Sequence, residues 1–210
     1  MYTPNKSDRD QFRKVWVIAE QRDGEIQEVT YELLGAAAEL AARRNTEIWS
    51  VIFGDRTDGL PERLFAYGAD TVLTVEDDRL ATLSDAVQGR ILVRMIEKYK
   101  PEIVLCGATA AGRSVIPRVA VQVNAGLTAD CTGLDIDADS GDLLQTRPAF
   151  GGNIMATIVC ANHRPQMATV RPRVMQAKQP DASRTGHLIR EAFLPQDVLP
   201  GLHVLKTWAT

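Results

Sequence analysis

The chain has 210 residues, of which 45% are apolar and 24% charged, with a formal net charge of −3 and a pI near 5.7. This length and composition are typical of one ordinary α/β domain with a sizeable core. The acidic balance and the scattered basic residues give no basic footprint, so nucleic acid is not expected as a partner.

The chain carries no targeting or membrane signal that its sequence would reveal. Residues 1–12 are polar and charged, without the apolar core of a signal peptide, and we expect them to form a flexible leader. No stretch approaches the ~20 apolar residues of a membrane span. The three cysteines, Cys106, Cys131 and Cys160, are widely spaced and form no CxxC pair, so neither a disulfide framework nor a metal site is expected. These features predict a reduced, cytoplasmic protein.

Short apolar runs alternate with helical stretches through the first 125 residues. The pattern predicts strands at 15–19, 47–53, 70–75 and 103–106, and helices at 30–44, 60–67, 84–99 and 112–123. The helix at 84–99 has the clearest apolar stripe, and Pro101 ends it. Pro117 is compatible with the last helix only in or near its first turn. This alternation predicts a three-layer α/β fold, with a mostly parallel sheet covered by helices on both faces.

The regular alternation of strands and helices ends after residue 125. Strands are expected at 127–136, 143–146, 154–160 and 167–172, and because no long helix separates them we expect antiparallel additions near the C-terminal edge. The β-branched run from Ile154 to Val159 predicts a buried strand. From 176 onward the chain is rich in proline and lacks periodicity, which predicts a loop, although Leu188 to Thr210 has enough apolar residues to pack against another part of the protein.

The segment CGATAAGRS, Cys106 to Ser114, lies where a strand meets the next helix. Ligands gather at such carboxyl ends of strands, where helix N-termini offer free N–H groups to anions. The segment is neither a Walker A loop nor a GxGxxG motif. It is either a phosphate site or a structural turn with a helix cap.

A second polar segment, LTADCTGLDID, contains Thr128, Asp130 and Cys131. Asp and Thr also form side-chain turns with the backbone. A nucleophilic Cys131 would need a histidine base, and the three histidines are too scattered for the sequence to pair one with it. An inert core thiol is therefore the preferred interpretation.

Four arginines, Arg147, Arg164, Arg171 and Arg173, follow within 27 positions. Arginine binds carboxylates and phosphates bidentately and stacks on flat rings. The alternative is a solvated edge with ion pairs.

These segments carry a family resemblance. The sequence resembles the N-terminal domain of the electron-transfer flavoprotein alpha subunit through VWVIAEQRDGEIQEVTYELLGAAAELA (15–41), YGADTV (67–72), KPEIVLCGATAAGRSVIPRVAVQVNAGLTADCTGLDID (100–137) and LLQTRPAFGGNIMATIVCANHRPQMATVRPRVM (143–175). The EQRDGEIQ-type start is most similar to the form that bifurcates electrons from NADH.

The resemblance implies an adenine-nucleotide-hydrolase-like domain at 13–175 that pairs with an electron-transfer flavoprotein beta subunit. In this family a C-terminal domain of the alpha subunit binds FAD, and the beta subunit holds AMP or a second FAD. Residues 176–210 would then be a linker or arm towards an FAD-binding domain that this chain lacks. FAD is accordingly expected in the complete heterodimer and not on this chain alone. An acyl-CoA dehydrogenase-type or other redox partner of the complex is also implied.

No catalytic residue is expected in this chain. By the resemblance, Arg147, Gly151, Gly152 and Asn153 face the flavin of the beta subunit, and a second set contributes to the interface: Arg164, Arg171, Thr128 and Asp130. Two alternatives stay open. One is an autonomous adenine-nucleotide binder or hydrolase that uses Gly107 to Ser114, and the other is a purely structural partner domain whose arginine-rich edge only meets the beta subunit.

Overall fold

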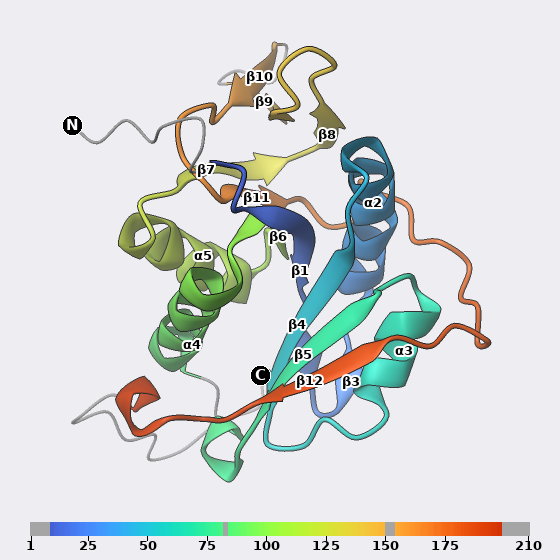
Figure 1. Ribbon diagram of the computed structural model, residues 1–210, viewed down its shortest axis with the longest axis vertical. Helices are drawn as coiled ribbons and strands as arrows, with labels where there is room; N and C mark the ends of the chain where they lie inside the picture. The colour runs from blue at the N-terminus through green and yellow to red at the C-terminus, as the bar shows by residue number, and fades with distance from the viewer. Residues whose placement is uncertain (1–8, 82–83, 150–153, 199–210) are drawn as a thin grey trace.

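The computed structural model describes residues 9–81, 84–149 and 154–198, and its central element is a seven-stranded sheet (Figure 1). The strand order is β12-β5-β4-β1-β6-β11-β7, and every pair of neighbours is parallel. The strands are β1 (Arg13–Ile18), β4 (Ile48–Gly54), β5 (Thr71–Glu76), β6 (Pro101–Gly107), β7 (Gly126–Cys131), β11 (Gln166–Val170) and β12 (His187–Glu191).

Helices cover both faces of this sheet, which confirms the predicted three-layer α/β fold. Figure 1 shows α2 and α3 on one side and α4 and α5 on the other. Their bounds are α2 (Glu28–Arg44), α3 (Leu60–Ala66), α4 (Asp85–Tyr99) and α5 (Ala110–Gln122), with single turns at η1 (Asp78–Leu80) and η2 (Pro195–Asp197). No helix in the described part of the chain is long and apolar enough to cross a membrane.

The strands supply two separate cores because successive side chains point to opposite faces of the sheet. On β1, Val15 and Val17 join the core beneath α2 and α3, whereas Trp16 and Ile18 join the core beneath α4 and α5. All four side chains are almost completely buried. Burial on both faces explains why this strand appears as a continuous apolar run in the sequence.

Helix α5 differs from its prediction. It begins at Ala110, so Pro117 lies in the helix interior and not in the first turn. Proline has no N–H, so one intrahelical bond to the carbonyl of Arg113 is missing. Pro117 and its neighbour Arg118 are exposed, which leaves this side of the helix open to water. The helix tolerates the proline at the cost of that bond.

The antiparallel additions form a separate sheet with the order β10-β9-β8, above β7 and the end of α2 in Figure 1. Its strands are β8 (Gly133–Ile136), β9 (Leu143–Pro148) and β10 (Met155–Val159), and a small hairpin, β2 (Gln21–Arg22) and β3 (Glu25–Ile26), follows β1. The expected strand 127–136 is thus two strands, β7 and β8. This sheet connects β7 to β11, a place where parallel strands usually have a crossover helix.

Two expectations about strands are wrong. The strand expected at 167–172 is β11, which is parallel and lies inside the main sheet between β6 and β7. The run Ile154 to Val159 is not a core strand: Ile154, Met155 and Val159 are 66%, 54% and 44% exposed. Strand β10 is the edge of the small sheet, so its apolar side chains cover a surface and not a core.

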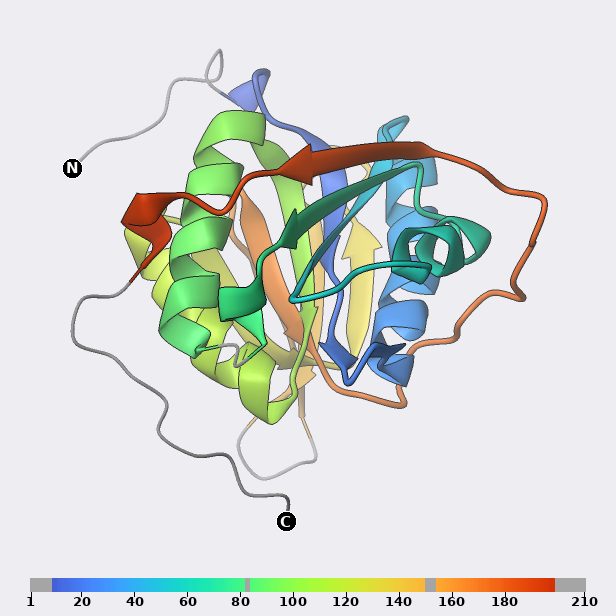
Figure 2. The same cartoon turned by 90° about the horizontal axis from the view of Figure 1, so that it is seen from below.

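Strand β12 was not expected, because residues 176–210 were assigned to a linker or arm. It pairs in parallel with β5 along its whole length. The segment that follows is tied to α4: Arg94 contacts Asp197 at 2.9 Å and Glu191 at 3.6 Å, and Lys98 contacts Glu191 at 2.6 Å. Figure 2 shows this segment crossing from the edge of the sheet to α4. The predicted leader lies mostly outside the described residues, as do 199–210.

Candidate functional site: two edges of the parallel sheet

The chain path reverses direction between β1 and β6, which are neighbours in the sheet. From β1 the chain proceeds to β4 and β5 on one side, and from β6 it proceeds to the strands of the other side. At the carboxyl end of β1, next to this reversal, lies a crevice of about 270 Å³. Such switch points are where open α/β sheets bind ligands. The crevice is lined by Ala19, Glu20, Gln21, Arg22, Gln27, Phe53, Asp85, Gln88 and Ala111.

The loop Cys106–Ser114 contributes Ala111 to this crevice and caps α5. Thr109 is the N-cap residue, and its hydroxyl accepts a hydrogen bond from the Gly112 N–H at 3.1 Å. The Thr109 hydroxyl in turn donates to Glu20 Oε1 at 3.0 Å, and Cys106 Sγ lies 3.8 Å from the same oxygen. Burial raises the pKa of Glu20 above its usual value, and these donors partly oppose that rise. The side chains of this loop are therefore bonded to the carboxylate of Glu20, a residue of the same chain.

The carboxyl ends of β7 and β11 carry a second polar group, which we call the Asp130 cluster: Asp130, Arg113, Arg147 and Arg171. Asp130 lies at an irregularity in the register of β7 with β11 and has a left-handed backbone, φ 61°. Its carboxylate accepts two hydrogen bonds from Arg171, Nη2 at 2.7 Å and Nε at 3.2 Å. Arg113 Nη2, from the start of α5, lies 3.8 Å from Oδ1. The Arg171 contact, with help from Arg113 and Arg147, lowers the pKa of Asp130.

Arg147 reaches this cluster from the antiparallel sheet. It lies on β9, opposite Ala156, on the same face as the buried Leu143 and Gln145. Its Nε donates to the carbonyl of Pro148 at 3.4 Å. Three arginines therefore converge on one carboxylate, and the group has an excess of positive charge. The predicted neighbours Gly151, Gly152 and Asn153 lie outside the described residues.

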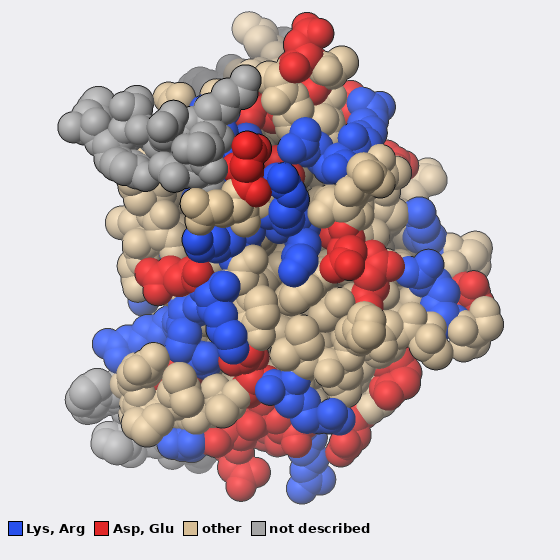
Figure 3. All heavy atoms as spheres, in the orientation of Figure 1, with Lys and Arg blue, Asp and Glu red and all other residues tan. Residues whose placement is uncertain are grey.

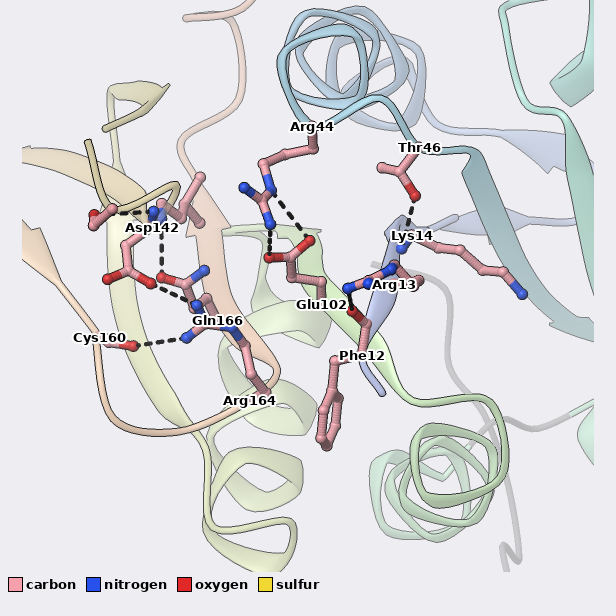
Figure 4. A network of polar contacts seen from close by, with 12 residues as sticks. Phe12, Arg13, Lys14, Arg44, Thr46, Glu102, Asp142, Cys160, Arg164 and Gln166 are labelled. Carbon is pink, nitrogen blue, oxygen red and sulfur yellow. Dashed lines mark hydrogen bonds and ion pairs between the residues drawn. The ribbon is translucent and has the colours of Figure 1, made fainter. Parts of the chain in front are cut away.

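Two of the predicted interface residues are buried. Thr128 is 3% exposed, at the centre of β7. The side chain of Arg164 is 6% exposed and pairs with Asp142, whose side chain is 5% exposed. Figure 4 shows this pair beside Gln166, at the amino ends of the strands. Gln166 Oε1 accepts from the Leu143 N–H at 2.9 Å. Both side chains are therefore packed inside the chain, and an interface role for Arg164 and Thr128 stays a prediction.

Comparison with known proteins identifies the family of the chain. The model of the electron transfer flavoprotein domain matches residues 15–193. The alpha subunit of the electron transfer flavoprotein from Clostridium acetobutylicum is 49% identical over 172 residues, which are 82% of this chain and 50% of that protein. The same subunit from Megasphaera elsdenii is 40% identical, over 88% of this chain and 54% of its own length.

The chain belongs to the electron transfer flavoprotein family. It also resembles a subunit of a lactate dehydrogenase (NAD(+),ferredoxin), LctC of Acetobacterium woodii, at 41% identity over 82% of this chain and 41% of that protein. The chain spans about half the length of the curated relatives it matches. The match includes β12, so this strand is a part of the electron transfer flavoprotein domain.

Glu20 is the polar residue of this electron transfer flavoprotein domain that the sequence did not reveal. Its partners Cys106 and Thr109 are 86 and 89 residues away, and a single carboxylate after an apolar run has no motif. The available signal was its position: Glu20 follows directly on the first predicted strand, at the carboxyl end where switch-point ligands bind. Among the described residues no group of His, Cys, Asp and Glu is arranged to hold a metal ion.

The surface charge of the domain is divided and not of one sign. In Figure 3, Lys and Arg side chains gather in the middle and on the left of the face, while Asp and Glu side chains lie between them and form a group at its lower edge. A divided charge distribution orients an approaching charged partner, because each sign attracts a different part of it.

The reactivity of the thiols provides a direct test of the core. Cys131 is completely buried, and burial raises its pKa to about 11 although Arg147 opposes the rise. Cys106 is also buried, and burial together with the nearby Glu20 raises its pKa well above the usual value. Because the thiolate is the reactive form, an aromatic disulfide reagent at pH 8 should label Cys160 alone in the folded chain and all three thiols in urea. Rapid labelling of a folded Cys160→Ser variant would contradict the burial of the other two.

Proposed function

We propose that the chain is the N-terminal domain of an electron-transfer flavoprotein alpha subunit, which acts as a scaffold and docks onto the beta subunit for flavin-based electron transfer. Support comes from the relatives that carry the name alpha subunit. The single observation that carries the proposal is the Asp130 cluster, an arginine-rich edge next to an exposed apolar sheet.

The apolar part of the docking surface is the outer face of the antiparallel sheet. Met155, Thr157 and Val159 of β10 point away from the domain, beside Leu144 and Thr146 of β9. Thr146 and Thr157 join their hydroxyls across the strands at 3.1 Å, so the face is ordered without a partner. Exposed apolar side chains on an edge strand favour an interface with another protein. The proposed occupant is the beta subunit.

The charged part is suited to an anionic group on that subunit. Flavin, when bound in the complete heterodimer, supplies the electron-carrying chemistry. Residues of this chain would contribute charge: a guanidinium next to a flavin stabilises its negatively charged reduced form. Arg147 is the residue proposed to do so, since Arg171 is already paired with Asp130. Within this proposal FAD is held by the heterodimer and not by this chain alone.

The finer assignment concerns the source and the destination of the electrons. We propose bifurcation from NADH, for which the name of one relative, a lactate dehydrogenase (NAD(+),ferredoxin) subunit, provides support. Another relative is named as an electron transfer subunit of acryloyl-CoA reductase. An acyl-CoA dehydrogenase-type enzyme is accordingly the redox partner we propose.

Replacing Arg147 with alanine in the heterodimer with the beta subunit tests the electrostatic role. The midpoint potential of the flavin nearest to this chain should become more negative, because a positive charge that stabilises the reduced form is lost. Spectroelectrochemical titration measures this shift. Arg22→Ala is the matched control: the Arg22 side chain is 75% exposed, lies outside the cluster, and its loss should leave the potential unchanged.

The result separates two forms of the proposal. If Arg147→Ala leaves the flavin potentials unchanged but weakens assembly of the heterodimer, the arginine-rich edge serves only as a structural contact with the beta subunit. Unchanged potentials and unchanged assembly would remove Arg147 from the function altogether.

A further inference from the structure

The layer between the antiparallel sheet and the main sheet contains buried polar atoms that form no hydrogen bond with any described residue. Gln145 is completely buried, and both Oε1 and Nε2 of its amide are in this state. The same holds for Thr128 Oγ1 and Gln166 Nε2, on residues that are also buried. The large majority of buried side-chain polar atoms in proteins are paired, either with protein or with ordered water. Among the described residues, these atoms lack the protein partners that burial requires.

The three side chains point into the same layer. Thr128 of β7 pairs with Ala168 of β11, which lies two positions after Gln166 and therefore on the same face of that strand. Ala168 belongs to the core beneath α2 and α3, and so does Leu143 of β9. Gln145 lies two positions after Leu143, on the same face of β9. The Gln145 amide is therefore directed at the face of the main sheet that carries Thr128 and Gln166.

Two hydrogen bonds fix the level of β9 along the main sheet. At the start of β9, the Leu143 N–H donates to Gln166 Oε1 at 2.9 Å, at the amino end of β11. Towards its other end, the carbonyl of Thr146 accepts from the N–H of Thr132, just after β7, at 2.8 Å. Gln145 lies between these two bonds. The middle of β9 therefore faces the middle of β7.

Water is the ligand that suits these groups. An amide oxygen accepts hydrogen bonds, an amide N–H donates them, and a hydroxyl does both, so the set complements both the hydrogens and the oxygen of a water molecule. A buried water typically forms about three such bonds. The three side chains are neutral and have apolar neighbours such as Leu143 and Ala168, which disfavours a charged ligand.

We propose that an internal water molecule binds between the two sheets and bridges the Gln145 amide to Thr128 Oγ1 and Gln166 Nε2. The consequence concerns Arg147, which lies two positions after Gln145 on the same face of β9, about 7 Å further along the strand. The bridge fixes β9 on the main sheet and with it the arginine that reaches the Asp130 cluster. Gln145 is thus a positioning residue for Arg147. The water site belongs to this chain alone and does not depend on docking onto the beta subunit.

The first experiment counts long-lived internal waters in the full chain by ¹⁷O magnetic relaxation dispersion. Gln145→Met keeps the length of the side chain and removes its amide, so this variant should hold one such water fewer than the wild type. Gln122→Met is the matched control: Gln122 is exposed on α5, and the same substitution there should leave the number unchanged. A folded Gln145→Met with as many internal waters as the wild type would overturn the proposal.

The second experiment tests the positioning of Arg147 by titrating the carboxyl carbon of Asp130 in the ¹³C NMR spectrum. Arg147 contributes to the lowered pKa of Asp130, so Arg147→Ala should raise that pKa. Gln145→Met should shift it in the same direction, and Gln122→Met should not. An unchanged Asp130 pKa in Gln145→Met would show that Gln145 supports packing only and would refute its positioning role.

A measurement on the wild type decides the matter if Gln145→Met does not fold. The side-chain amide protons of Gln145 should give NOE and ROE cross-peaks with water of opposite sign, the signature of a water that stays bound while the protein tumbles. If these protons give no such pair of cross-peaks, no internal water binds to Gln145 and the proposal is incorrect.

Discussion

Replacing Asp142 with alanine is expected to lower the free energy of unfolding by about 3–5 kcal/mol, because the Arg164 guanidinium would stay buried without its counter-ion. Both side chains of this pair are almost completely buried. Chemical denaturation followed by circular dichroism measures the loss. Asp139→Ala is the matched control, since Asp139 lies exposed in the same turn and should change stability by less than about 0.5 kcal/mol.

A double variant separates the charge from the packing. Combining Asp142→Ala with Arg164→Met removes both charges and keeps most of the volume of the arginine, so much of the stability should return. If the single variant Asp142→Ala unfolds at the same denaturant concentration as Asp139→Ala, the buried pair does not exist in solution.

Gly112→Ala and Gly89→Ala should change stability in opposite directions, although both glycines are buried in helices on the same face of the sheet. In Gly112→Ala the new methyl group would meet the Gly107 carbonyl oxygen at 2.0 Å. We expect a loss of about 3 kcal/mol, the upper end of the range for overpacking. In Gly89→Ala the nearest atom is Val119 Cγ2 at 3.8 Å, an ordinary contact. Here alanine should stabilise α4 by about 0.5–1 kcal/mol, since glycine loses more backbone freedom on folding.

The same denaturation curves, compared with the wild type, test the pair of glycines. A Gly112→Ala variant as stable as the wild type would show that the loop has room to relax away from α5, and the close packing of Gly112 on the Gly107 carbonyl would then be incorrect.

The local sequence pattern was sufficient to predict helices that bury one apolar stripe and strands that are buried on both faces. Helix α4 was predicted within one residue because Ile91, Leu92, Met95 and Ile96 form one buried stripe. The position of β11 was not predictable in this way. Its neighbours in the sheet, β6 and β7, depend on the topology of the whole fold. In addition, the residues that connect β7 to β11 form strands, where a helix is usual.

Strands at edges were the least predictable. Strand β12 has two half-buried apolar residues, Leu188 and Ile189, between polar neighbours, so it resembles a loop until it pairs with β5. Strand β10 has the opposite character: its residues are apolar enough for a core, and yet three of the five are exposed. A sequence records that a side chain is apolar, and not whether the chain itself or another molecule covers it.

The candidate site was predictable as a set of residue types but not as a geometry. Arg147, Asp130 and Arg171 were predicted, and the structure brings them together although Asp130 and Arg171 are 41 positions apart. Arg164 lies in the same arginine-rich stretch and is buried, because its partner Asp142 is supplied by the turn before β9. Partner identity across such separations depends on the fold, which residue types alone do not determine.

The position of β11 has a consequence for the order in which the protein is made. β11 lies between β6 and β7, yet both of these leave the ribosome before it. A nascent chain that has emerged only as far as β10 therefore has β6 and β7 with unsatisfied backbone groups facing each other across a missing strand. Synthesis adds about 5–20 residues each second, so the 11 residues from the end of β10 to the end of β11 keep this state open for about half a second to two seconds. The main sheet is completed only late in translation, and the antiparallel sheet, whose strands are neighbours in sequence, can form while β11 is still being made.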